Sequence, residues 1–161
     1  MSATGISDFT AAPAIKRRIY EDALYVFQDD TNVDVAYGFA WPPTTDDWVS
    51  VEEVQAAVDP VGIGPRRQQD ETVTVTVSVG SYRSGNDSAT EIEAAERAWS
   101  LLRCLWEYIR TEDITLGGNA LWCVPGDCTS AGATDEGDAG YGRVTEINAQ
   151  FVARHRIRSE S

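Results

Sequence analysis

The stretch from Ser88 to Arg110 constrains the fold most, because its start and its period can both be read from the sequence. Ser88-Ala-Thr-Glu91 matches a capping box, in which a serine caps the helix start and a glutamate three residues later reaches back to it. Behind this cap, apolar residues recur at steps of three and four, which predicts a helical stripe that faces a core. The stripe consists of Ile92, Ala95, Trp99, Leu102, Trp106 and Ile109.

A second apolar row lies beside the first on the same predicted helix, so the helix is expected to be covered on more than one side. It either packs between a sheet and another helix of its own domain, or packs on its own sheet and also on a neighbouring copy. The second row consists of Ala94, Ala98, Leu101, Leu105 and Tyr108. In the second arrangement Ala98, Leu101, Leu105 and Tyr108 are candidate subunit-interface residues.

The clearest strand runs from Glu71 to Val79, where valines alternate with threonine and serine. This period of two directs the valines toward a core and the hydroxyl side chains to the opposite face. Such alternation is typical of an antiparallel sheet with one wet face. The final strand, Arg143 to Arg156, alternates in the same way. Together the two strands predict a polar sheet face that contains Thr72, Thr74, Thr76, Glu146, Asn148 and Gln150.

The rest of the chain adds one helix and three further strands. The helix is predicted at Ala12–Gln28, and the strands at Val35–Trp41, Trp48–Gln55 and Asp113–Val124, the last interrupted near Gly117 and Gly118. This order predicts an α+β fold, an antiparallel-rich mixed sheet with two helices packed on one face and long inter-strand loops. A length of 161 residues suits a single domain that spans residues 1–161.

Two long loops are expected. Residues 59–70 contain prolines and glycines that exclude regular structure, and they carry the adjacent pair Arg66 and Arg67, so this stretch is predicted to be an exposed arm. The arginine pair is either solvated or a contact for an acidic partner. Residues 125–140 are poor in hydrophobic side chains and rich in glycine and acidic residues, which predicts a mobile acidic loop.

Composition limits the classes of partner. Thirteen basic against 26 acidic residues give a net charge of −13, which opposes affinity for a phosphate backbone. No apolar run approaches the length of a membrane span, and the first ten residues lack the pattern of a signal peptide, so we expect a soluble cytosolic protein without membrane contact. Cys104, Cys123 and Cys128 are then expected to be reduced thiols.

No arrangement of residues in the sequence predicts an enzyme. His155, the only histidine, stands between two arginines near the end of a strand, where a solvated side chain is the simplest expectation. Cys123 and Cys128 have no second cysteine pair or nearby histidine, which makes a zinc site a weak hypothesis. We therefore expect no catalytic residues, no metal and no cofactor.

Taken together, the order and the size of these elements resemble the tail terminator proteins of long-tailed (siphovirus-type) bacteriophages. The resemblance rests on the N-terminal helix with Ile15-Lys-Arg-Arg-Ile19, on Val35–Trp41 ending in prolines, and on the arm before the valine strand. It continues through the stretch from Glu96-Arg-Ala-Trp99 to Arg110-Thr-Glu-Asp-Ile-Thr-Leu-Gly-Gly118.

The resemblance implies a structural virion protein at the head-proximal end of the tail, present in the host cytoplasm during assembly. It implies a homohexameric ring that caps the tail tube, ends its growth and joins head-side neck or stopper proteins. It also implies that DNA passes through the lumen without specific binding, and the polar sheet face is then a candidate for either the lumen wall or a wet outer surface. The alternatives are a head-tail stopper, a tail tube subunit, or a small cytosolic ligand-binding domain or enzyme with a pocket near Trp41 and Trp48.

Overall fold

The computed structural model of the chain describes residues 10–38, 45–58, 69–137 and 140–157. In chain order the elements are α2 (Ala12–Val26), β1 (Val33–Tyr37), β2 (Asp47–Val58), β3 (Gln69–Ser84), α3 (Ser88–Glu112), β4 (Trp122–Gly137) and β5 (Gly140–Ile157). The predicted order of helices and strands is therefore confirmed. The predicted arm lies almost wholly outside the described residues, as do Arg66, Arg67 and Trp41.

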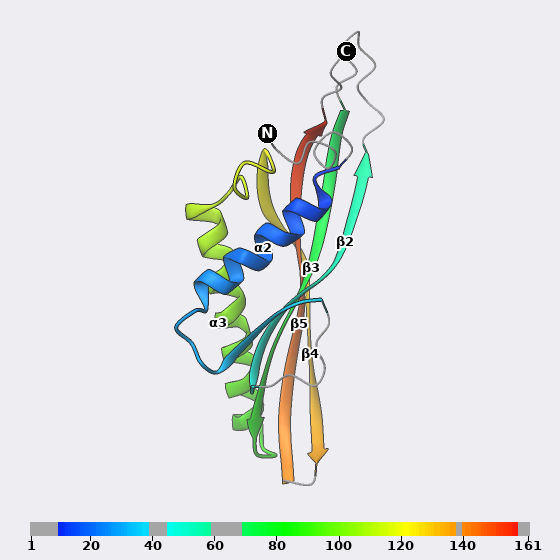
Figure 1. Cartoon of the computed structure of the whole chain (residues 1–161). Helices are drawn as coiled ribbons and strands as arrows, with labels where there is room; N and C mark the ends of the chain where they lie inside the picture. The colour runs from blue at the N-terminus through cyan, green and yellow to red at the C-terminus, as the bar shows by residue number, and fades with distance from the viewer. Residues whose placement is uncertain (1–9, 39–44, 59–68, 138–139, 158–161) are drawn as a thin grey trace.

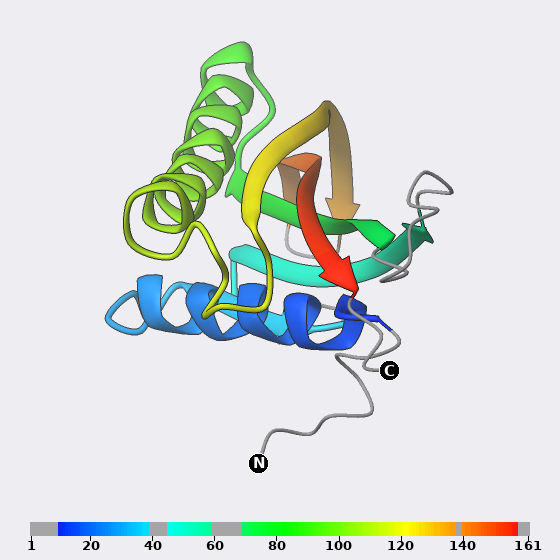
Figure 2. The ribbon, with the colours of Figure 1, turned by 90° about the horizontal axis from the view of Figure 1, so that it is seen from above.

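The five strands form one mixed sheet in the order β1-β2-β3-β5-β4. β1 runs parallel to β2, whereas the β2–β3, β3–β5 and β4–β5 pairs are antiparallel. Both described helices cover the same face of the strongly twisted sheet, and the view from above shows no helix of the described residues on its other face (Figures 1 and 2). The predicted α+β class is confirmed.

The core lies between the two helices and β3, as the alternating valines predict. Val73, Val75, Val77 and Val79 are fully buried. They pack in one apolar cluster with side chains of α2, α3 and β5, among them Ile15, Ile19, Leu101, Leu105 and Phe151. Because successive residues of a strand point to opposite faces, burial of the valines leaves the threonines between them on the uncovered face.

The start of α3 differs from the predicted capping box by one residue. Asp87 is the N-cap: its backbone is extended, and its side chain accepts a hydrogen bond from the Thr90 amide at 2.9 Å. The Asp87 carboxylate also accepts from the Thr90 hydroxyl at 2.6 Å. Ser88 is instead the first helical residue. A carboxylate satisfies a free N–H group at the helix start and also opposes the positive end of the helix dipole.

The predicted mobile loop at residues 125–140 is wrong for most of its length. Residues 125–137 belong to β4, which pairs with β5 as far as Gly137, with a bulge between Pro125 and Cys128. The segment forms an edge strand, in which backbone pairing alone can hold residues that bury little apolar surface. The predicted strand at Asp113–Val124 is also corrected, because turns occupy residues 114–119 and β4 begins at Trp122.

Two aromatic side chains cover glycines on the sheet face away from the helices. The Trp48 ring lies over Gly80, where an added Cβ would fall 1.9 Å from a ring carbon. The Tyr82 ring lies over Gly142, where an added Cβ would fall 2.1 Å from a ring carbon. Trp48 is only 8% exposed. Its ring therefore fills the space over Gly80.

Candidate interaction surfaces

Of the two arrangements that the sequence leaves open for α3, the structure shows the first, in which the second apolar row is buried within its own domain. Ala98, Leu101 and Leu105, predicted at a subunit interface, are 0–1% exposed in the core of their own chain. Tyr108 is half-buried, and its ring centroid lies 5.3 Å from that of Tyr25. An interface with another copy cannot use the three core side chains in this conformation.

The stripe predicted to face the core instead splits between core and solvent. Leu102 and Ile109 are buried, but Ile92 is 56% and Trp99 44% exposed. Trp106 is intermediate and lies edge-on to Phe151, with ring centroids 5.9 Å apart. One arc of α3 packs against β3, β5 and α2, and the neighbouring arc with Ile92 and Trp99 is left exposed.

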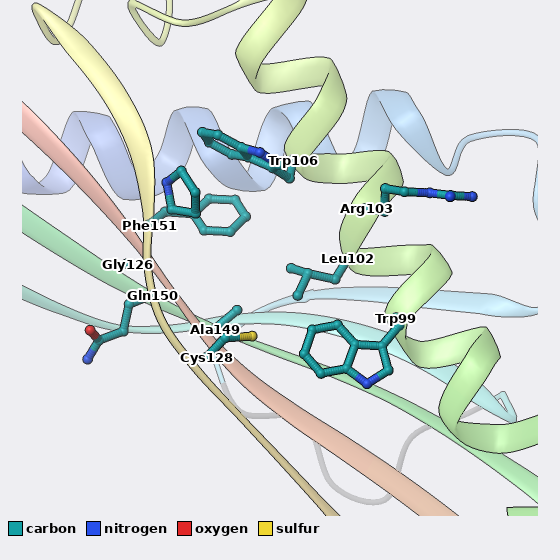
Figure 3. Close-up of a pocket in the computed structure, with 10 residues that line it drawn as sticks. Trp99, Leu102, Arg103, Trp106, Gly126, Cys128, Ala149, Gln150 and Phe151 are labelled. Atoms are coloured by element: carbon teal, nitrogen blue, oxygen red, sulfur yellow. The ribbon is translucent and has the colours of Figure 1, made fainter. Parts of the chain in front are cut away.

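An apolar groove of about 270 Å³ lies between α3 and the bulge of β4. Trp99, Leu102 and Trp106 project from the helix toward the strands, while Cys128 and Phe151 contribute from β4 and β5 (Figure 3). Arg103 stands at the rim, and its side chain extends from the helix away from the strands (Figure 3). The groove offers apolar contact and one thiol, but no acid–base pair.

The six residues predicted for the polar sheet face do share one face. Thr76 pairs with Gln150, and the neighbouring register places Asn148 opposite Ser78 and Glu146 opposite Gly80. Glu146 and Asn148 are exposed, whereas Thr72, Thr74, Thr76 and Gln150 are half-buried. Toward one end of this face the apolar side chains of Trp122 and Val124 are also 39% exposed.

Asp47 anchors α3 to the sheet. Its carboxylate accepts hydrogen bonds from Ser81 at 2.7 Å, Arg83 at 2.8 Å and Arg97 at 2.9 Å. Burial opposes ionisation of this side chain, but the hydrogen bonds from Arg83, Arg97 and Ser81 outweigh it and hold the pKa of Asp47 below its usual value. The carboxylate is fully engaged, which fits a structural contact and not a proton-transfer role.

A second acidic cluster joins α2 to the end of α3. The Arg18 guanidinium donates to Asp113 at 2.8 Å and lies 3.5 Å from Asp22. Burial of Asp22, followed by its hydrogen bond and charge interaction with Asp113, raises its pKa to about 8. Burial also opposes ionisation of Asp113, but the hydrogen bonds from Arg18, Asp22 and the Gly117 amide together outweigh it and lower that pKa. The pair thus holds one proton near neutrality.

His155 is not the solvated side chain that the sequence predicted. Its Nδ1 lies 3.2 Å from Glu71 Oε1, and Glu71 is 1% exposed. Glu71 also accepts from the Ala11 amide at 2.9 Å and from the Thr10 hydroxyl. Because the carboxylate stands between the hydroxyl and the imidazole, the histidine does not contact the hydroxyl and cannot act as its base. The cluster ties the start of α2 to β3 and β5.

Sequence reasoning missed these buried acids. Asp22, Asp47 and Glu71 are at most 3% exposed. Asp22 interrupts an apolar helical row, and Glu71 continues the core-facing period of the β3 valines. An acid at a core position of an otherwise apolar pattern is therefore the signal that would have found two of the three.

The cysteines lie in different surroundings. All three are free, with Cys104 and Cys128 exposed and Cys123 buried, where burial raises its pKa to about 12. Within the described residues, no group of three or more histidine, cysteine or acidic side chains is placed to hold a metal ion. No helix in the same part of the chain has the length and apolar character needed to cross a membrane.

Comparison with known proteins adds little to this geometry. Neither a protein-family model nor a curated protein matches the sequence. Among solved structures, a chain from the virion of a native gene transfer agent particle is similar, with a TM-score of 0.41 and 11% sequence identity. The similarity covers 90% of this chain and 98% of that one. A likeness at this level defines neither a family nor a role.

Proposed function

We propose that this chain is a structural virion protein of the tail-terminator type, which forms a homohexameric ring at the head-proximal end of a long tail. The observation that carries the proposal is the polar sheet face, which no described helix covers. In a ring with the helices outside, this face lines the lumen. Exposed Glu146 and Asn148 then offer passing DNA no positive charge.

The two edges of the sheet are also suited to head-to-tail contact. Among the described strands, β4 is a 16-residue edge and β1 a five-residue edge at the other side. Contact between two unlike patches, repeated by rotation, closes a ring. Residues 128–134 of β4 carry no charge, and edge strands that avoid pairing usually carry one. We place the subunit contact of the ring at these edges, and not at the buried row of α3.

The proposed partners are the tail tube below and a neck or stopper protein above. Arg66 and Arg67 form a local positive charge in a chain of net charge −13, which suits contact with carboxylates on an adjoining ring. We assign the arm at residues 59–70 to this contact.

Electron microscopy of the purified protein, alone and mixed with tail tube protein of the same virus, tests the proposal. Rings that sit on tube ends and stop their elongation are expected, with light scattering reporting the ring mass. A double variant, Arg66→Ser with Arg67→Ser, should still form rings but cap tubes poorly. A protein that stays monomeric in both conditions and leaves tube length unchanged would contradict the proposal.

A further inference from the structure

The outer row of α3 is an exposed strip in which Glu96 and Arg103 flank Trp99 on either side. Ile92 and Trp99 are 56% and 44% exposed, and a shallow hollow beside them is also lined by Glu96, Ser100 and Arg103. An exposed tryptophan on a rigid helix is costly to leave in water and is enriched where one protein binds another. The strip therefore has the composition of a contact surface.

The two charged side chains of this strip have no partner within the described part of the chain. Other arginines of the fold have an acidic partner. Arg83 and Arg97 pair with Asp47, and Arg156 pairs with Asp70. Glu96 and Arg103 are exposed and seven residues apart, about 10 Å along the helix, which is too far for them to pair with each other. Each is available to another molecule.

The spacing of these residues is symmetric about one point. Glu96 and Arg103 lie at equal distances on either side of the midpoint between Trp99 and Ser100. If a second α3 lies antiparallel across a twofold axis at that midpoint, Glu96 of each copy meets Arg103 of the other. Near the axis, Trp99 of one copy then lies against Trp99 of the other, and Ser100 lies against Ser100. Opposite charges at equal distances from the axis, with an exposed tryptophan of each copy between them, make the strip complementary to itself.

From this geometry we propose that two copies of the chain associate through an antiparallel α3–α3 contact, centred on Trp99 and Ser100 and closed by two Glu96–Arg103 ion pairs. The contact lies on the helix layer, whereas the ring proposed above uses the sheet face and its edges. It therefore goes beyond the ring and does not depend on it. An unrelated acidic partner could also meet Arg103, but it would leave Glu96 without a cation.

Charge reversal gives the main test. Sedimentation equilibrium at physiological ionic strength, which screens the net charge of each copy, should show a wild-type dimer. Glu96→Arg alone and Arg103→Glu alone should each weaken the dimer by about tenfold or more, because each creates two like-charge contacts. The double variant, Glu96→Arg with Arg103→Glu, should restore it, since both ion pairs re-form with reversed sign. Arg17→Glu, the same change at an exposed site on α2, should have no effect.

A crosslink tests the symmetry. In a Cys104→Ser, Cys128→Ser background, Ser100→Cys should oxidise to a covalent dimer, because the axis brings the two copies of this residue together, whereas Arg17→Cys should not. A wild-type monomer, a double variant that stays dissociated, or no Ser100→Cys crosslink would each overturn the inference. If the protein forms rings that cap tubes but the Glu96 and Arg103 variants sediment like wild type, the α3–α3 contact is overturned and the proposed function stands. A charge-sensitive dimer that never caps tubes would do the reverse.

Discussion

At the scale of single residues, the Asp22–Asp113 pair sets a pH dependence. The raised pKa of Asp22, about 8, means that the folded chain holds a proton there that the unfolded chain releases at acidic pH. Unfolding therefore releases a proton between the ordinary carboxyl pKa and about 8. The contribution of Asp22 to stability is greatest at the acidic end of this window and falls as pH rises through it.

Asp22→Asn removes the titratable proton of the folded state and keeps the size of the side chain. We expect the free energy of unfolding of the variant, relative to wild type, to rise by a few kcal/mol from about pH 5 to about pH 9. Urea unfolding at several pH values measures it. Glu107→Gln, at an exposed position of α3, is the control and should follow the wild-type profile. Equal pH profiles for Asp22→Asn and wild type would show that Asp22 is ionised in the folded state.

At the scale of elements, the start of α3 depends on Asp87 and not on Ser88. Asp87→Ala removes the acceptor of the Thr90 amide, so we expect a loss of about 1 kcal/mol in the free energy of unfolding. Ser88→Ala, at the exposed first position of the helix, should change stability by only a few tenths of that amount. Thermal or denaturant unfolding of the two variants compares them directly. The opposite order of effects would restore the capping box with Ser88 as the cap.

At the scale of the whole molecule, the net charge of −13 governs contact with nucleic acid. Most arginines that stabilise the fold are already neutralised: Arg83 and Arg97 by Asp47, and Arg18 by Asp113. We therefore expect no binding of duplex DNA with sub-micromolar affinity, even at low salt, where electrostatic attraction is strongest. Fluorescence anisotropy with a labelled duplex measures it, with a basic DNA-binding protein as the positive control. Tight binding there would exclude a lumen that conducts DNA without holding it.

The sequence by itself determined the two helices and the extended segments of β1, β2, β3 and β5, and on which face of β3 the core lies. Periods of 3.6 and of two are local properties, and the alternating valines of β3 can be buried together on only one side of a strand. The same local reasoning found the polar sheet face, because Thr74 and Asn148 occupy the complementary positions of their strands.

Only the tertiary structure decided what covers each surface. Both rows of α3 are apolar, so periodicity cannot tell which one meets β3 and β5; the way α3 packs on the sheet buries Leu101 and Leu105 and leaves Trp99 exposed. The polar residues of β4 show no period, yet pairing with β5 makes them a strand, since the hydrogen bonds of a ladder come from the backbone of a distant segment. The pairing of Glu71 with His155, 84 residues apart, has the same cause. Contacts of this kind depend on strand register, which the whole sheet fixes together.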